Sequence, residues 1–249
     1  MKFLLWCCSF IVLHNLSAQD HNISIEYKVQ FNKNFDRGIS MMSYTATLNV
    51  DATTSIFFMI PDNRDDVAGN ELSLSAATDT FLFTSKDITN QKLVFASPSL
   101  TGKTYYYNDT LHPMQWELFE DEKLIDSLLC YKATCVFRGR QYIAWYCPAI
   151  AMPHGPWKLG GLPGLIIEAL DVNDNLHFTL SKLTYEKRLT DQVRTFSDDL
   201  PDFEGYKNYW TALIKKMDGA LTATETNSSC VGCQTKSTSK VYMWEKWTE

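Results

Sequence analysis

The sequence predicts a mainly β protein, built as a curved antiparallel sheet or half-barrel with one C-terminal amphipathic helix packed on it. Three observations lead to this class: apolar and polar residues alternate over many short segments, turn clusters separate those segments, and one later stretch has helical spacing. Because successive side chains of a strand point to opposite faces, alternation is typical of a sheet with one buried face. We therefore expect a single hydrophobic core on one side of the sheet.

The clearest alternation begins near the N-terminus, where Ile23, Ile25, Tyr27 and Val29 are separated by polar residues. Turn clusters at 32–34 and 61–64 favour breaks between strands. Further strands are predicted at 41–50, 55–60, 80–84, 92–96, 103–108 and 115–119.

Two hairpins follow in the second half of the chain. Residues 128–137 and 141–147 are joined through Arg138-Gly139-Arg140, with glycine at the bend. Residues 165–170 lead through a turn at 173–175 into a returning strand at 176–180. These segments predict an antiparallel meander.

A helix is predicted after Pro201, ending at about Asp218. Its apolar residues fall three and four positions apart, which places them on one stripe: Phe203, Tyr206, Trp210, Leu213 and Met217. The stripe either covers the sheet or lines a ligand groove. Beyond it, residues 222–240 are rich in serine and threonine and predict a mobile loop, and 241–247 predict a final strand.

A glycine-proline turn runs directly into an apolar strand at 160–167. Pro163 fixes its own φ and favours extended geometry at Leu162, so we expect a sharp turn into a buried strand. Another turn cluster lies just upstream at 153–157.

The hexapeptide Gly-Leu-Pro-Gly-Leu-Ile at 161–166 occurs together with an upstream block, Cys130 to Thr134, Phe137 to Arg140 and Trp145. In this combination, over roughly residues 125 to 170, the chain closely resembles the GLPGLI family of Bacteroidetes cell-envelope proteins. The resemblance implies an envelope location, and it implies no established activity.

The N-terminus has the pattern of a secretory leader, predicted here as a signal peptide over 1–18. Lys2 is followed by an apolar stretch at 3–13 and a small-residue cleavage site at Ser17-Ala18-Gln19. We expect export to the periplasm or the cell surface, a single β-rich domain over 19–249, and no transmembrane segment.

The charge balance argues against nucleic acid as a partner. The chain has 23 basic and 29 acidic side chains and a formal net charge of −6. Loss of Lys2 with the leader makes the mature charge about −7. Phosphate backbones need a basic surface, and the sequence has no basic stripe.

No catalytic, metal-binding or cofactor-binding motif is evident, so we expect no metal and no cofactor. One catalytic alternative stays open: His154 and His177 flank the motif turn and could meet near Glu168 or Asp171 for acid–base work.

The cysteines predict disulfide chemistry in an exported chain. Cys230 and Cys233 are expected to form a local disulfide, with a redox pair as the alternative. Cys130, Cys135 and Cys147 are an odd set with no pairing assigned. Two of them could bridge across the hairpin, but if Phe137 paired near Tyr142, Cys135 would face Ala144 and not Cys147. The odd count predicts one free or intermolecular thiol.

The turns around the motif supply the candidate binding residues, as the rigid lip of an apolar cleft: Trp145, His154, Gly155, Pro156, Trp157, Gly161, Leu162, Pro163 and Gly164. In that interpretation Trp157 and Leu162 are exposed anchors. In the structural alternative the turn is only rigid, and Leu165, Ile167 and Trp145 enter the core. The burial of Trp157 distinguishes the two.

The sequence therefore predicts a non-enzymatic binding or carrier module for a lipid or other hydrophobic ligand, or for an envelope partner. The alternatives are a structural or interaction protein of an outer-membrane transport system, and a cryptic hydrolase or redox protein.

Overall fold

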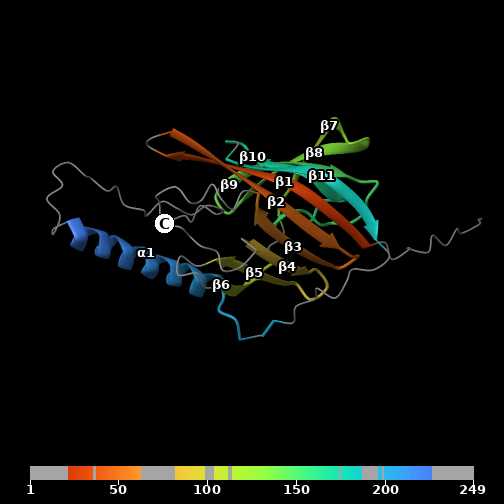
Figure 1. Ribbon diagram of the computed structural model, residues 1–249. Helices are drawn as coiled ribbons and strands as arrows, with labels where there is room; N and C mark the ends of the chain where they lie inside the picture. Colours follow the sequence, from red (N-terminus) through yellow and green to blue (C-terminus); the bar gives the residue numbers. More distant parts are fainter. Residues whose placement is uncertain are drawn as a thin grey trace, which may run out of the picture.

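The computed structural model describes residues 22–35, 38–62, 82–98, 104–111, 114–173, 175–186, 196–197 and 199–225. Within these residues, eleven strands form a continuous antiparallel sheet, which is open at both edges, in the order β6-β5-β4-β3-β2-β1-β11-β10-β9-β8-β7. A helix, α1, follows β11 (Figure 1). The predicted mainly β class is confirmed.

The strands have these bounds: β1 Asn22–Phe35, β2 Gly38–Val50, β3 Thr54–Pro61, β4 Leu82–Asp87, β5 Lys92–Pro98, β6 Thr104–Thr110, β7 Glu117–Ile125, β8 Leu128–Phe137, β9 Arg140–Cys147, β10 Leu165–Asp171 and β11 Leu176–Glu186. Helix α1 spans Phe203–Glu225.

The predicted alternation is confirmed in β1, where Ile23, Ile25, Tyr27 and Val29 are all buried. The predicted turn at 32–34 is wrong, because β1 and β2 remain paired as far as Phe35 opposite Gly38. Polar composition there does not interrupt the backbone pairing of the two strands.

The β8–β9 hairpin has the predicted glycine turn. Arg138 and Gly139 both have positive φ, 50° and 70°, which matches a two-residue turn with the twist of the flanking strands. The register differs by two residues from the one considered above: Phe137 lies opposite Arg140, and Cys135 lies opposite Tyr142.

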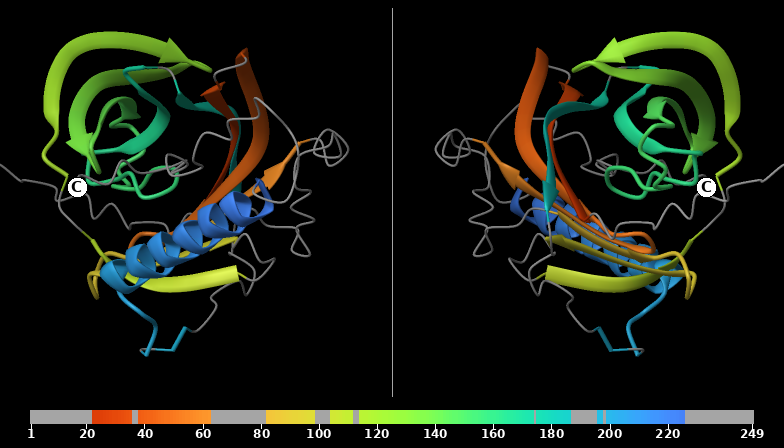
Figure 2. Two further views of the ribbon diagram at one scale, coloured as in Figure 1. Left: turned by 90° about the vertical axis from the view of Figure 1, so that its left-hand side faces the viewer. Right: turned by 90° about the vertical axis from the view of Figure 1, so that its right-hand side faces the viewer.

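The sheet curves so strongly that its two halves face each other across a shared interior (Figure 2). β7, β8 and β9 curl around the segment that connects β9 to β10, and β3 to β6 form the opposite wall. Every strand except β7 contributes buried side chains to one hydrophobic core inside this curve. We call this inner side the concave face.

Helix α1 begins after Asp202, whose Oδ1 accepts a hydrogen bond from the backbone N–H of Gly205 at 2.8 Å. Its first turns lie on β6, where Tyr206 stacks on Tyr107 at 4.2 Å and Tyr209 stacks on Tyr105 at 4.5 Å between ring centroids. The helix then runs past the edge of the sheet (Figure 1). The predicted packing of the helix on the sheet is confirmed.

Some expectations reach beyond the described residues. The helix extends to Glu225, so 222–225 are helical and the predicted loop at 222–240 is wrong for those four residues. The rest of that loop, the predicted strand at 241–247 and the leader at 1–18 lie outside the described residues. Within the described part of the chain, no helix has the length and apolar character needed to cross a membrane.

Candidate functional site

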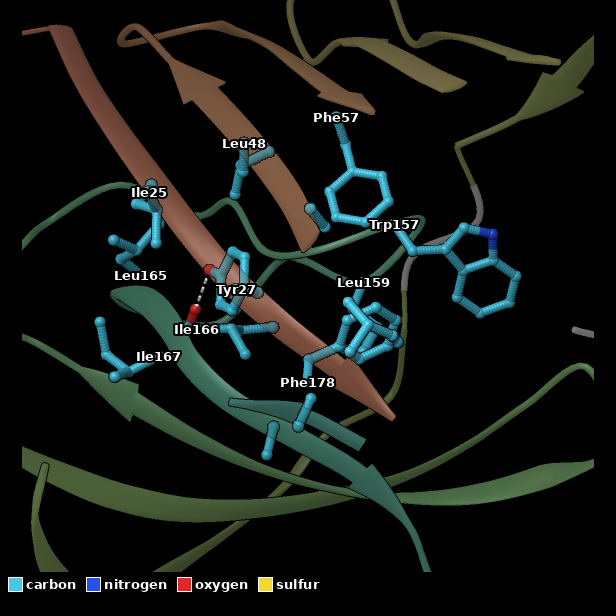
Figure 3. Packing of buried hydrophobic residues seen from close by; sticks show 14 of the residues in the cluster. Ile25, Tyr27, Leu48, Phe57, Trp157, Leu159, Leu165, Ile166, Ile167 and Phe178 are labelled. Carbon is cyan, nitrogen blue, oxygen red and sulfur yellow. Dashed lines mark hydrogen bonds between the residues drawn. The ribbon is translucent and has the colours of Figure 1, made fainter. Parts of the chain in front are cut away.

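The connection from β9 to β10, residues 148–164, folds into the concave face; we call it the plug loop. Trp157 and Leu159 are 0% exposed and Leu162 is 1% exposed. Figure 3 shows Trp157 and Leu159 in one group with side chains from β1, β2, β3, β10 and β11. The loop thereby occupies the space that the curved sheet encloses.

A buried lysine of β4 holds the middle of the plug loop. Lys86 Nζ donates hydrogen bonds to the carbonyl oxygens of Gly155 at 3.0 Å and Leu159 at 2.5 Å. Complete burial lowers the pKa of Lys86 to about 7, because the charged form loses its hydration. The Lys86 side chain therefore satisfies two buried carbonyl groups, although burial destabilises its charged form.

A second cation belongs to the plug loop itself. Lys158 Nζ lies 2.8 Å from Asp109 Oδ2 and 2.9 Å from the Tyr107 hydroxyl, both on β6. Arg138, in the β8–β9 turn, reaches the other oxygen of Asp109 at 2.7 Å. One carboxylate of edge strand β6 therefore connects the plug loop and the β8–β9 turn.

Aromatic rings surround the Lys158 ammonium. Its Nζ lies 4.6 Å from the ring centroid of Phe95, 5.2 Å from Tyr107, and 5.6 Å from both Trp157 and Phe203. Cation–π attraction is strongest in such a desolvated setting. Phe203 places the first turn of α1 at this cluster.

Backbone and side-chain hydrogen bonds fix the plug loop and the start of β10, the strand that follows it. The N–H groups of Leu165 and Ile166 donate to the carbonyls of Ile150 and His154 at 2.9 and 3.0 Å. Tyr27 donates its hydroxyl to the Ile166 carbonyl at 2.6 Å, a contact drawn in Figure 3. Trp116 Nε1 donates to the Gly160 carbonyl at 2.9 Å.

Three glycines of the plug loop, Gly155, Gly161 and Gly164, resist replacement by larger residues for different structural reasons. A Cβ on Gly164 would meet the backbone carbonyl of Cys147, and a Cβ on Gly155 would lie 2.7 Å from Ile166 Cδ1. Gly161 has open space around it, but its φ of +86° disfavours other residues. Close packing at two positions and backbone conformation at the third account for the motif turn.

The two proposed anchors do not face solvent. Trp157 and Leu162 are buried within the plug loop, so the expectation that they are exposed is wrong and the structural interpretation of the motif is favoured. His154, Gly155, Pro156 and Gly164 are buried with them, and Gly161 and Pro163 are exposed at the surface. These candidate residues therefore lie together in the plug loop. The side of the loop that faces the core is packed with buried side chains.

Trp145 is separated from the rest of the set. Its neighbours Ala144 and Tyr146 point into the core, so the half-buried Trp145 points to the convex face, where Lys123 Nζ lies 5.4 Å from its ring centroid. Trp145 packs against the core cluster while remaining partly exposed, so its expected entry into the core is met only in part, whereas Leu165 and Ile167 are fully buried as predicted.

The two candidate histidines do not meet. His154 is buried among plug-loop residues, and burial, with the charge of Lys86 as a smaller cause, lowers its pKa to about 3. His177 lies on β11 with its Nε2 3.0 Å from Glu168 Oε1. Lys123 Nζ lies 2.5 Å from the other oxygen of Glu168. These contacts lower the Glu168 pKa and form an ion cluster on the convex face.

The cysteine expectations are tested in part. Cys230 and Cys233 lie outside the described residues. Cys130, Cys135 and Cys147 are buried free thiols, so the structure has three free thiols in this region. Among the described residues no group of three or more His, Cys, Asp or Glu could hold a metal ion.

A half-buried aromatic surface lies beside the plug loop, where α1 crosses the concave side of β6. We call it the α1–β6 aromatic surface; its residues are Tyr105, Phe203, Tyr206, Tyr209 and Trp210. Tyr206 lies 6.4 Å from Phe95 and 6.2 Å from Trp210 between ring centroids, so the surface is continuous with the core.

The sequence interpretation missed the polar residues that hold the plug loop, above all Lys86, Asp109 and Lys158. A signal existed for Lys86, because it follows Leu82 and Thr84 at strand spacing, and all three are buried. The contact of Lys158 with Asp109 spans 49 residues of sequence and leaves no local pattern.

Comparison with known proteins gives a limited match. The family described as "Protein of unknown function (Porph_ging)" matches residues 135–168, which lie within the stretch that resembles the GLPGLI family. This partly supports a Bacteroidetes envelope family, and the GLPGLI assignment stays a prediction. No curated protein matches.

Among solved structures, two crystal forms of PNGF-II are similar, with TM-scores of 0.51 and 0.50 at 15% sequence identity. The match covers 76% of this chain and 32% of PNGF-II, so the chain spans about a third of that protein's length. A putative outer membrane lipoprotein-sorting protein domain from Vibrio parahaemolyticus matches with a TM-score of 0.30, 8% identity, and coverage of 70% of this chain and 89% of that one. The PNGF-II likeness shows a shared fold.

Proposed function

We propose that this protein is an exported, non-enzymatic binding module of the cell envelope that takes a hydrophobic ligand at the α1–β6 aromatic surface. The supporting observation is that surface itself: five aromatic side chains from two elements lie half-buried against the core. Aromatic rings supply large apolar contact areas at little cost in side-chain entropy, and a ligand would bury what the fold leaves accessible.

The plug loop decides where such a ligand would lie. Trp157, Leu159 and Leu162 already fill the interior of the curve. A ligand placed there would have to displace Lys86 and Lys158 from their hydrogen bonds, leaving buried carbonyls and a carboxylate without those donors. The ligand is therefore assigned to the surface beside α1, and the plug loop provides a rigid support under it.

Native mass spectrometry of the protein isolated from its own envelope tests this proposal. The expected spectrum contains the mature protein without residues 1–18 and a population carrying a non-covalent lipid mass. That added mass should disappear after extraction with an apolar solvent. Repeated spectra that contain only unliganded protein would contradict the ligand, and a mass that retains the leader would contradict export.

A second candidate, an interaction protein of an outer-membrane transport system, is favoured by one observation. Edge strand β7 and its partner β8 expose large apolar side chains: Leu118 at 53%, Leu124 at 71%, Leu129 at 42% and Val136 at 73%. A strand edge with exposed leucines is suited to pairing with another chain. A photo-crosslinking residue at position 124 should then capture a specific envelope protein in intact cells, whereas one at exposed Gln141 should not.

A further inference from the structure

Two buried cysteines face each other in the β8–β9 hairpin. Tyr131 lies opposite Tyr146, and one step further along both strands are Cys130 and Cys147. Both side chains are 0% exposed, and the two thiols lie close enough together for Cys147 to contribute to the raised pKa of Cys130. Cys135 lies opposite Tyr142, farther along the hairpin. The register therefore selects one pair from three buried cysteines.

The hairpin geometry suits a disulfide at this pair. Directly opposite residues of antiparallel strands have Cα atoms about 4.5 or 5.5 Å apart, depending on the hydrogen-bond pattern. Disulfides occur at Cα separations of about 4.4 to 6.8 Å. A bond between Cys130 and Cys147 thus needs only side-chain adjustment.

Cys147 also lies at the base of the plug loop, because it is the last residue of the strand before the loop and pairs with the strand after it. It lies opposite Leu165, the first residue of β10, and its carbonyl accepts a hydrogen bond from the Ile150 N–H at 3.1 Å. Gly164 packs against the same carbonyl. A covalent link here would hold both ends of the loop to β8.

We propose that Cys130 and Cys147 form a disulfide bond in the exported protein, which fastens the base of the plug loop. The two thiols lose two protons and two electrons as the S–S bond forms, and the electrons reduce the disulfide of a protein thiol oxidant to two thiols. The proposal goes beyond ligand binding, and it rests on export to an oxidising compartment.

Burial of the pair keeps solvent thiols away from it. Both side chains are 0% exposed, and desolvation raises the pKa of the Cys130 thiol to about 12. A finished bond at this position is therefore protected from external thiols.

Peptide mapping of the protein from its own envelope tests the proposal directly. The protein is denatured in guanidinium chloride at neutral pH with N-ethylmaleimide present and no reductant, and it is then digested. The expected result is a peptide pair joined through Cys130 and Cys147, two hydrogens lighter than the reduced pair, with Cys135 alkylated. Alkylation of both Cys130 and Cys147, or linkage of either to another cysteine, would overturn the proposal.

A second experiment, with purified and refolded protein, tests the disulfide independently of export and of ligand binding. The mature chain is first freed of the other expected disulfide by Cys230→Ala/Cys233→Ala. This background protein is refolded in a glutathione redox buffer without further change, with Cys135→Ala added, and with the double variant Cys130→Ala/Cys147→Ala added. Reduction should lower the Tm of the first two by about 6 to 12 °C, as expected for a loop of this size, and leave the protein with the double variant unchanged. An equal fall in all three, or none in any, would overturn the bond whatever the ligand experiments show.

Discussion

Lys158 of the plug loop and Asp109 of edge strand β6 form a buried ion pair, with 2.8 Å between Nζ and Oδ2. Asp109 belongs to the wall formed by β3 to β6, and Lys158 belongs to the loop that fills the interior. Arg138, in the β8–β9 turn of the opposite wall, joins the same carboxylate at 2.7 Å. Charge as well as apolar packing therefore connects the plug loop and the two walls. We expect the stability of the fold to depend on this carboxylate.

Replacing Asp109 with asparagine should destabilise the protein by about 3 kcal/mol, because it removes the charge that two largely buried cations face. Urea unfolding of wild type and variant measures the difference. The matched control is Asp121→Asn, whose ion pair with Lys132 is 3.7 Å long and exposed, and it should cost less than about 1 kcal/mol. Equal effects of the two substitutions would contradict the role of Asp109.

The two motif glycines should differ in their tolerance of alanine. Gly164→Ala places a Cβ against the backbone of Cys147 and Pro148, which cannot move aside easily, and should cost about 3 kcal/mol. Gly161→Ala meets only the penalty of its positive φ, about 1 to 2 kcal/mol. Thermal unfolding ranks the two; a larger loss for Gly161→Ala would show that packing against Cys147 is unimportant.

Stability should fall as the pH is lowered from 7 to 5, in part because of His154. Its pKa is 6.5 in an unperturbed chain and about 3 when folded, so between these values the unfolded chain binds a proton that the folded chain does not. Unfolded protein is therefore favoured as pH falls, by up to about 1.4 kcal/mol per pH unit and about 2 kcal/mol over this range.

The variant His154→Gln isolates that contribution, since it keeps a neutral polar side chain that does not titrate. Its unfolding free energy should change less between pH 7 and 5 than that of wild type. His177→Gln is the control, because His177 is partly exposed and paired with Glu168. If His154→Gln and wild type have the same pH dependence, His154 is not the buried neutral group described here.

Most of the sheet could be predicted because its signal is local. Residues 22–32 of β1 alternate in burial, and Gly139 is the residue type that a positive φ favours in the β8–β9 turn. The predicted break at 32–34 failed because polar composition was taken as a turn, although backbone pairing of β1 with β2 does not depend on burial of the side chains.

The site was harder to predict because its geometry is non-local. The plug loop has turn residues typical of a surface lip, and only the curvature of the distant strands β3 to β6 makes it an interior segment. The opposed positions of Cys130 and Cys147 were missed for a smaller reason: a register error of two residues in one hairpin moved the two cysteines out of alignment.

The central claim is that a hydrophobic ligand binds at the α1–β6 aromatic surface, and titration with a fluorescent fatty acid tests it most directly. Trp210 contacts Tyr206 and Tyr209 on its own helix, so Trp210→Ala leaves the stacking of α1 on β6 in place. The matched control is Tyr185→Ala on β11, where the ring is 59% exposed. We predict saturable binding to wild type and to Tyr185→Ala, and a Kd raised at least about tenfold for Trp210→Ala, a loss of about 1.4 kcal/mol. No saturable binding to wild type, or equal Kd values for all three proteins, would contradict the account.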